Sequence, residues 1–332
     1  MIPVEWMEQA KRRLDGLIHQ TPLTYDTDHN LYLKWENRQI TGSFKIRGAL
    51  NKVLCLERWE QQRGLVTASA GNHGQGVAYA ARKVDAPVIV FASEHAAPGK
   101  VEKMRALGAD VRLVPGGYAD AERAGLRYAD EHDLTWVSPY NDGRVIAGQA
   151  TVGLEILSQM APVMPMAVIV PVGGGGLIGG IGAAVGNSAS LQGMDARPLV
   201  IGVNSEASPF FHAIYYTGSQ TGVEEQPSLA DGLSGAVEEG SITIPLVRSF
   251  ADRFVLVSED QVAQAVAFAY RRYGEVIEGS AAVALAAALD RDRLNLAPTE
   301  SPIAVVISGG NIQPEVHEQI CARWGAAEQG AA

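Results

Sequence analysis

Short runs rich in valine and isoleucine alternate along the sequence with longer segments that carry a helical pattern. Between the runs, segments such as Pro98–Leu107, which Gly108 ends, and Arg144–Met160 are long enough to connect two parallel strands across the face of a sheet. The sequence therefore predicts an α/β fold with mostly parallel sheets that helices cover on both faces. The runs lie at residues 65–68, 88–91, 110–114, 134–137, 167–172, 199–203, 254–257 and 303–307, and a further short strand is predicted at residues 31–35.

The length and composition of the chain indicate two domains with large cores. The chain has 332 residues, a little over twice the length of about 150 residues that is common for one domain. Hydrophobic residues make up 47% of it and charged residues 19%, which is below the roughly 25% typical of soluble domains. We expect two domains that share a cleft. The least patterned segment, residues 217–240, is predicted to be a loop beside that cleft.

The charge balance argues against nucleic acids and membranes as partners. Lysine and arginine number 27 and aspartate and glutamate 37, so the net charge of −10 does not attract a phosphate backbone or an anionic membrane. The most continuous apolar stretch, residues 161–172, is interrupted by prolines and is shorter than the roughly 20 residues that span a bilayer. The first residues do not resemble a signal peptide, and the two cysteines, Cys55 and Cys321, fit a reducing compartment. We therefore expect a cytoplasmic protein.

A run of four glycines, Gly173–Gly176, follows the apolar run at 167–172 and precedes a predicted helix. In parallel α/β sheets, such a turn lets backbone N–H groups and the helix dipole face a phosphate. Two alternatives stay open at this point. The spacing Gly174-x-Gly176-x-x-Gly179, with Glu206 beyond the next strand, also fits the dinucleotide fingerprint of a nicotinamide-dependent oxidoreductase. The glycines can also form a purely structural turn, although four in succession lose much backbone entropy on folding.

Lys45 begins a predicted helix in the segment Thr41-Gly-Ser-Phe-Lys-Ile-Arg-Gly-Ala49. A lysine at such a position is ordinarily a solvated surface charge. Phe44 beside it offers an apolar wall, and a lysine in a desolvated pocket loses its proton readily and forms a Schiff base with an aldehyde. Lys45 is therefore a candidate for covalent carbonyl chemistry.

Two further turns carry polar residues between a strand and a helix. In the segment Ser69–His73, Ser69 is predicted to cap the helix, and exposed amides can hold a carboxylate. Asn72 adds a donor and an acceptor, whereas His73 has no acidic neighbour in the sequence and suits a positioning or structural role better than that of a base. The turn Ser308-Gly-Gly-Asn311 places a hydroxyl where it can reach a ring nitrogen in the cleft. Each turn alone also fits an ordinary cap or loop.

Four motifs together resemble the pyridoxal-phosphate-dependent serine/threonine dehydratase family, which also includes serine racemases. The resemblance extends from about Thr21 to Asn311 and implies fold type II, the tryptophan-synthase-β-like fold, with a smaller domain inserted in a larger one. It predicts a large cofactor-binding domain of residues 1–52 and 146–332 and a small α/β domain of residues 53–145. It also implies a homodimer. The motifs are Ser43–Ala49, Ser69–Gln75, Gly173–Leu177 and Ser308–Asn311, in this order.

The resemblance assigns a role to each candidate residue. Lys45 forms the Schiff base with pyridoxal 5'-phosphate and is the catalytic base, and Phe44 packs beside the cofactor ring. Asn72 hydrogen-bonds the phenolic oxygen of the ring, Ser308 faces its pyridine nitrogen, and Glu278 lies near the cofactor. The phosphate is bound by Gly173, Gly174, Gly175, Gly176 and Leu177, and the substrate carboxylate by Ser69, Ala70, Gly71, Asn72 and His73.

The implied reaction converts L-threonine or L-serine to 2-oxobutyrate or pyruvate and ammonia by β-elimination. Lys45 takes the Cα proton while the cofactor ring spreads the resulting charge. A neutral Ser308 hydroxyl stabilises a ring cation less than a carboxylate does, which favours rapid loss of a β leaving group. Serine racemases carry a second acid–base serine where this chain has Ala70. The sequence therefore favours a dehydratase over the alternative, a serine racemase.

Three further expectations concern substrates and regulation. A 3-hydroxyaspartate dehydratase is a second alternative, but it requires an additional cation, for which Arg127 is the candidate considered. Racemase-like members bind a divalent cation through a glutamate, a carbonyl and an aspartate, at positions that here hold Glu206, Phe210 and His212. Because histidine replaces the aspartate, no metal site is predicted. The chain ends about twenty residues after Asn311, so no regulatory domain is expected.

Overall fold

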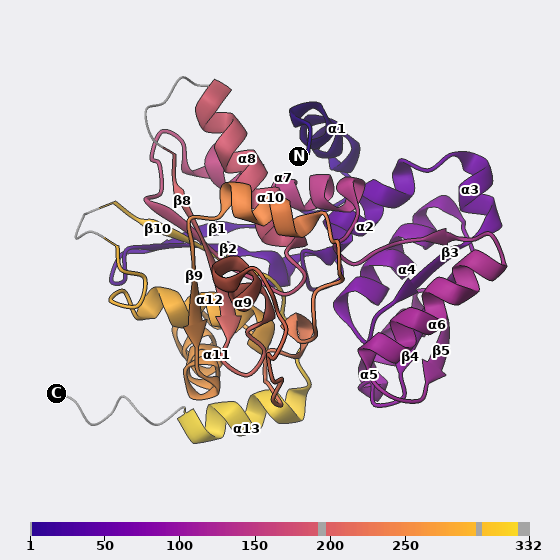
Figure 1. Cartoon of the computed structure of the whole chain (residues 1–332). Coiled ribbons are helices and arrows are strands. Elements are labelled where there is room, and N and C mark those ends of the chain that lie inside the picture. The colour runs from indigo at the N-terminus through magenta and orange to yellow at the C-terminus, as the bar shows by residue number, and fades with distance from the viewer. Residues whose placement is uncertain (1, 192–196, 297–300, 325–332) are drawn as a thin grey trace.

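The computed structural model describes residues 2–191, 197–296 and 301–324, and its strands form two sheets (Figure 1). One sheet has six strands in the order β1-β2-β10-β7-β8-β9, and the other has four in the order β5-β4-β3-β6. Neighbouring strands pair in parallel except β1 and β2, which are antiparallel. The predicted α/β fold with mostly parallel sheets is confirmed.

The six-stranded sheet consists of β1 (Leu23–Asp26), β2 (Leu31–Trp35), β7 (Ala167–Pro171), β8 (Leu199–Ser205), β9 (Arg253–Val257) and β10 (Ile303–Ile307). The four-stranded sheet consists of β3 (Leu65–Ala68), β4 (Val88–Ser93), β5 (Asp110–Val114) and β6 (Thr135–Trp136). The helices are α1 (Val4–Leu14), α2 (Lys45–Leu54), α3 (Arg58–Arg63), α4 (Asn72–Val84), α5 (Pro98–Ala106), α6 (Tyr118–Glu131), α7 (Gly143–Met160), α8 (Gly176–Leu191), α9 (Phe210–Thr217), α10 (Thr243–Phe250), α11 (Glu259–Tyr273), α12 (Gly279–Leu289) and α13 (Pro314–Trp324), with two short 3-10 helices, η1 (Glu36–Arg38) and η2 (Asp231–Leu233).

Local sequence signals explain where several helices begin and end. The Asp142 side chain accepts hydrogen bonds from the backbone of Arg144 and Val145 at the start of α7. At α11, the Ser258 side chain accepts a hydrogen bond from the backbone of Gln261, and Gly274 ends the helix with φ of +69°. The N-caps of α7 and α11 follow β6 and β9, so the chain turns from strand to helix over a few residues at both places.

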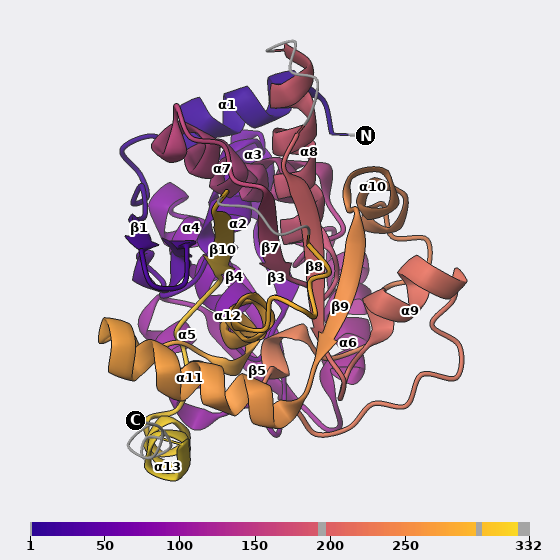
Figure 2. The same cartoon turned by 90° about the vertical axis from the view of Figure 1, so that its left-hand side faces the viewer.

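The central strands of the larger sheet are buried on both faces. Along β7, Ala167 and Ile169 pack into one core with α11 and α12, whereas Val168 and Val170 pack into another with α7 and α8. This alternation follows from the two-residue period of a strand and explains why the sequence shows an unbroken apolar run there. Figure 2 shows α13 beside α11, at the end of the molecule opposite α1.

The smaller sheet is covered by α2, α4 and α5 on one face and by α6 on the other. Ile46 and Leu50 of α2 share a core with Leu65 and Val77, and α6 packs on Val66 and Phe91. Helix α2, which carries Lys45, thus packs on the smaller sheet, while Phe44 just before it packs against a core of the larger sheet. The predicted boundaries of the two domains, at 52/53 and 145/146, stay a prediction, and the predicted end of the large domain lies outside the described residues.

The strand β1 is absent from the sequence-based prediction. It has four residues, lies at the edge of the sheet, and exposes Thr24 and Tyr25. An edge strand with one exposed face does not need a run of apolar residues, so the pattern used to find the other strands does not detect it.

None of the helices in the described part of the chain has both the length and the apolar character needed to cross a membrane.

Candidate active site

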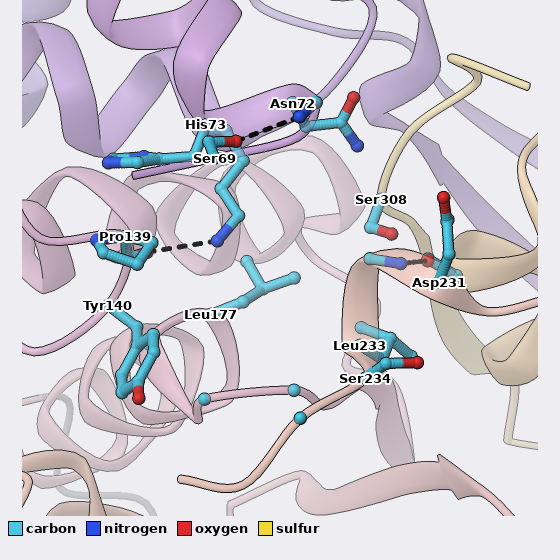
Figure 3. A pocket seen from close by; sticks show the side chains of 18 of the residues that line it. Ser69, Asn72, His73, Pro139, Tyr140, Leu177, Asp231, Leu233, Ser234 and Ser308 are labelled. Atoms are coloured by element: carbon cyan, nitrogen blue, oxygen red, sulfur yellow. Dashed lines mark hydrogen bonds between the residues drawn. The ribbon is translucent and has the colours of Figure 1, made fainter. Parts of the chain in front are cut away.

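A cavity of about 400 Å³ lies where the two sheets meet, within the range of roughly 300–1,000 Å³ usual for small-molecule sites. Its walls come from the turns that follow β3, β6, β7 and β10 and from the start of α2 (Figure 3). The structure therefore brings the predicted site residues together, while their individual roles stay predictions. The predicted residues that line the cavity are Phe44, Lys45, Ser69, Ala70, Gly71, Asn72, His73, Gly173, Gly174, Gly175, Gly176, Leu177, Glu278 and Ser308.

Lys45 is the first residue of α2, and its amine lies in this cavity. Nζ donates a hydrogen bond to the carbonyl oxygen of Pro139 at 3.1 Å and lies 5.3 Å from the centre of the Phe44 ring. Burial lowers the pKa of Lys45 to about 8, although the charge of Glu278 acts in the opposite direction. The amine therefore loses its proton far more readily than a solvated lysine does, as a nucleophile toward an aldehyde requires.

The turn after β10 fixes the segment before Lys45. The backbone N–H of Phe44 donates to the carbonyl oxygen of Ser308 at 3.0 Å, and that of Gly310 donates to Gly42 at 2.9 Å. Ser43 and Gly309 form an isolated β-bridge between these two hydrogen bonds. Two segments separated by more than 250 positions in the sequence are thus held side by side, with Lys45 and Ser308 facing one cavity.

Asn72 is held from both sides by side chains. Its Nδ2 atom donates to Oε1 of Glu278 at 2.7 Å, and its Oδ1 atom accepts from Nδ2 of Asn311 at 2.8 Å. Burial, with a smaller contribution from the charge of Asp231, raises the pKa of Glu278 to about 7. A Cβ atom at Gly309 would lie 2.6 Å from Oε1 of Glu278 and 3.0 Å from Cβ of Ser43, so a larger residue there would displace this carboxyl group.

The Ser69–His73 turn differs in one detail from the prediction. Ser69 accepts a hydrogen bond from the backbone of Gly71 at 3.1 Å, and Gly71 itself is the N-cap residue of α4. Ser69 therefore stabilises the turn and does not cap the helix, so that prediction is wrong. The reason is that the helix begins at Asn72, which places Ser69 outside capping distance.

His73 is buried at the first turn of α4. Its Nε2 atom lies 3.0 Å from the carbonyl oxygen of Val137, to which the ring donates. Burial, assisted by the charge of Lys45, lowers the pKa of His73 to about 3. The imidazole is therefore neutral at physiological pH, and its positioning role stays a prediction.

The glycine loop has no room for side chains. A Cβ atom at Gly174 would lie 2.3 Å from the ring of Tyr140, and one at Gly175 would lie 2.5 Å from the ring of Phe211. Gly175 also has φ of +84°, a conformation that other residues adopt with strain. Helix α8 begins at Gly176, so the bare backbone of the loop leads directly into a helix N-terminus, as a phosphate site requires.

The residues considered for a nucleotide ribose and for a metal ion lie elsewhere. Glu206 is exposed, lies 4.0 Å from Arg293, and does not line the cavity. His212 instead packs against the ring of Tyr216, with centres 4.8 Å apart. Within residues 2–191, 197–296 and 301–324, no three His, Cys, Asp or Glu side chains gather closely enough to hold a metal ion.

Sequence reasoning missed several residues that line the cavity. Pro139 and Tyr140 follow β6 in a strand-to-helix turn of the same kind as the predicted ones, so their position was a usable signal. Lys100 lies in the first turn of α5, after β4, and belongs to none of the motifs that selected the other residues. Residues 231–236 also line the cavity, and they belong to the segment predicted as a cleft-side loop.

The geometry of the cavity fits pyridoxal phosphate. A buried amine with a lowered pKa is available for the aldehyde, and a turn without side chains precedes a helix N-terminus for the phosphate. Phe44 and Leu177 provide apolar walls, and Asn72 and Ser308 provide polar atoms for the substituents of a ring.

Comparisons with known proteins agree with this fit. The family model described as "Pyridoxal-phosphate dependent enzyme" matches residues 14–309. The L-threonine ammonia-lyase of Thermotoga maritima is 40% identical over 326 residues, which cover 96% of this chain and 78% of that protein. The processed form of threonine deaminase isoform 2 from Solanum lycopersicum superposes with a TM-score of 0.84 at 28% identity, covering 96% of this chain and 94% of that one. The serine racemase of Dictyostelium discoideum gives a TM-score of 0.83 at 30% identity, covering 94% and 99%. The chain therefore belongs to the family of pyridoxal-phosphate dependent enzymes.

Proposed function

We propose that this enzyme is an ammonia-lyase that converts L-threonine or L-serine to 2-oxobutyrate or pyruvate and ammonia. The observation that carries the proposal is the desolvated Lys45 amine in a cavity whose other walls are the bare glycine loop and the Ser69–His73 turn. The similarity to an L-threonine ammonia-lyase over 96% of the chain supports the choice of reaction.

The proposed roles follow from the chemistry of the groups that line the cavity. Pyridoxal phosphate, when bound, supplies a conjugated ring that accepts the electron pair of a broken Cα–H bond. Lys45 Nζ takes the Cα proton, because burial favours its neutral form. The N–H groups of Gly173–Gly176 and the start of α8 would hold the phosphate. The amides of the Ser69–His73 turn hold the substrate carboxylate at the start of α4.

Loss of the β-hydroxyl is favoured over inversion at Cα. Inversion requires a group that returns a proton to the face opposite Lys45. Ala70 lines the cavity where racemases of this family carry a serine, and its methyl group cannot donate a proton. Serine racemase remains the second candidate, because the structure of this chain is similar to that of a serine racemase.

A substrate with a second carboxylate fits the cavity less well. Arg127 is exposed on the surface of α6, where it lies 3.8 Å from Glu131. It does not line the cavity, so it is not placed to bind a second carboxylate. Lys100 does line the cavity, but it is paired with Asp231 at 2.8 Å.

A panel of substrates tests the proposal. The purified enzyme with its cofactor receives L- and D-serine, L- and D-threonine and 3-hydroxyaspartate, and the release of 2-oxo acid and the loss of chirality are both measured. We expect 2-oxo acid from L-threonine or L-serine, and none from a Lys45→Ala variant. Inverted amino acid without any 2-oxo acid would replace the lyase by a racemase.

We also propose that the enzyme is a cytoplasmic homodimer, as the family resemblance implies. Sedimentation of the cofactor-bound protein measures the assembly directly. A mass twice that of the chain is expected, and a mass equal to that of one chain would refute the dimer.

A further inference from the structure

Lys100 lies against the turn proposed to bind the substrate carboxylate. It belongs to the first turn of α5 and reaches across Gly71. Its Cδ and Nζ atoms lie 3.3 and 3.7 Å from the position of a Cβ atom built on Gly71. Its side chain is only 17% exposed and lines the same cavity as Lys45. A positive charge is therefore confined next to the N-terminus of α4.

The partner of Lys100 comes from the other side of the cavity. Nζ of Lys100 lies 2.8 Å from Oδ2 of Asp231, the first residue of η2, in the loop that lies on the larger sheet's side. Gly232 beside it donates to Oγ of Ser280 at 2.9 Å, which fixes the turn. The Asp231 side chain is 62% exposed. The pair is thus asymmetric: the cation is enclosed, whereas the carboxylate can turn into water at little cost.

The turn proposed to bind the carboxylate carries no positive charge of its own. His73 is neutral at physiological pH, and Ser69, Ala70, Gly71 and Asn72 carry no charge. Backbone N–H groups and a helix dipole stabilise a carboxylate, but a charge-assisted hydrogen bond is about twice as strong as a neutral one. Among the described residues that line the cavity, Lys100 is the one lysine or arginine besides Lys45, and it lies beside this turn.

We propose that Lys100 binds the α-carboxylate of the amino-acid substrate, and that Asp231 is a counter-ion which the substrate carboxylate displaces. This inference rests on the proposed function and adds a binding residue to it. It also explains why an exposed aspartate faces a cavity that receives an anionic group. A purely structural role for the pair makes the opposite prediction, because removal of either partner would then disturb the cavity in the same way.

The test compares two substitutions with two ligands in the cofactor-bound enzyme. L-Alanine lacks the β-hydroxyl that elimination requires, and L-alaninamide also lacks the carboxylate. Dissociation constants are measured from the cofactor absorbance and, independently, by calorimetry. Lys100→Met is expected to weaken L-alanine binding by about 10- to 100-fold and to change L-alaninamide binding little. Asp231→Asn is expected to strengthen L-alanine binding several-fold and to leave L-alaninamide binding unchanged.

Two further variants serve as controls. Arg127→Met removes a positive charge from the surface of α6, away from the cavity, and should change neither dissociation constant. Lys100→Arg retains the charge and should recover most of the affinity for L-alanine. Thermal midpoints of all variants identify any that fail to fold. If Lys100→Met fails to fold, the Asp231→Asn and Lys100→Arg results decide whether Lys100 binds the carboxylate.

The inference is overturned if Lys100→Met and Asp231→Asn both weaken L-alanine binding, or if Lys100→Met weakens both ligands equally. Its failure is distinct from failure of the proposed function. If the variants show the predicted changes in ligand binding but the wild-type enzyme releases no 2-oxo acid, the role of Lys100 is upheld and the lyase is refuted. If the wild-type enzyme releases 2-oxo acid but Lys100→Met and Asp231→Asn both weaken L-alanine binding, the lyase is upheld and the role of Lys100 is refuted.

Discussion

A methyl group at position 174 would lie 2.3 Å from Cδ1 of the Tyr140 ring, well inside the closest approach of two carbon atoms. Tyr140 cannot move away freely, because its hydroxyl accepts a hydrogen bond from the backbone of Glu238 at 2.9 Å. The loop must therefore shift, and its N–H groups with it. We expect Gly174→Ala to weaken pyridoxal phosphate binding by at least about tenfold, a loss of roughly 1.4 kcal/mol, measured by equilibrium titration of the apoenzyme.

Gly99→Ala is the matched control for this substitution. Gly99 lies in α5 with no atom within 4 Å of an added Cβ, so cofactor affinity should stay unchanged. Equal affinities of the wild type and Gly174→Ala would mean that the loop does not hold the phosphate.

His73 gives a pH dependence of stability whose sign is fixed by its environment. Burial lowers its pKa to about 3, whereas the unfolded chain binds a proton near pH 6.5. Between these values the unfolded state holds more protons, so the free energy of unfolding falls as the pH falls from 6.5 to 3. The His73→Gln variant keeps a side-chain donor but has no group that titrates in this range. When the pH falls from about 7 to about 5, its free energy of unfolding should therefore decrease by about 2 kcal/mol less than that of the wild type. Urea midpoints at both pH values measure this, and parallel curves for the two proteins would contradict it.

At the residue scale, the sequence identified many of the residues that line the cavity but only part of their interactions. Lys45, Asn72 and the glycines lie in short motifs, so local spacing was sufficient to select them. The roles of Pro139 and Lys100 arise from contacts with residues far away in the chain, which spacing does not encode.

Helix α2 is anchored by a buried network of charges. Nε of Arg47 donates to Oε2 of Glu36 at 2.7 Å, and Nη1 donates to Oε1 of Glu155 at 2.6 Å. Glu155 also accepts from Lys34. These bonds tie α2 to η1, α7 and β2 two residues after Lys45. The sequence pattern does not predict this network, because an arginine in a helix is ordinarily solvated and its partner lies 108 positions away.

Loss of one member leaves a buried charge without its partner. Arg47→Met should therefore lower the free energy of unfolding by about 3–5 kcal/mol, because Glu36 remains fully buried. Arg63→Met breaks an exposed pair with Asp133 and should cost less than about 1 kcal/mol. Urea denaturation of both variants measures the difference, and similar midpoints would show that the network does not stabilise α2.

Strands were easier to predict than caps. Fully buried strands such as β7 and β10 show as unbroken apolar runs, and their predicted positions are confirmed. The start of α4 was misplaced because Ser69, a good capping residue, lies three positions before the helix begins.

The whole molecule places the cavity between two lobes, one built around each sheet, and side chains connect the lobes across it. Lys100 and Asp231 form one such connection, and Lys103 with Asn311 at 3.3 Å forms another. The two-domain division at 52/53 and 145/146 came from the family resemblance. The length of the chain predicted two domains but not where one ends and the other begins, because length does not show on which sheet helix α2 packs.

A cofactor that contacts both lobes should stabilise the whole chain. At a concentration of about 100 times its dissociation constant, binding adds about 2.7 kcal/mol to the free energy of unfolding. We expect pyridoxal phosphate to raise the thermal midpoint of the apoenzyme by several degrees, as measured by calorimetry. A midpoint that does not depend on the cofactor would contradict binding of pyridoxal phosphate to the folded enzyme.

The identity of the amine that binds the cofactor is the central claim, and peptide mapping tests it most directly. The cofactor-bound enzyme is reduced with borohydride and digested, and the modified lysine is located by mass spectrometry. We predict that the added mass lies on Lys45 in the segment Ser43–Ala49. A modification located on Lys100 or on any other lysine, with Lys45 unmodified, would contradict the account.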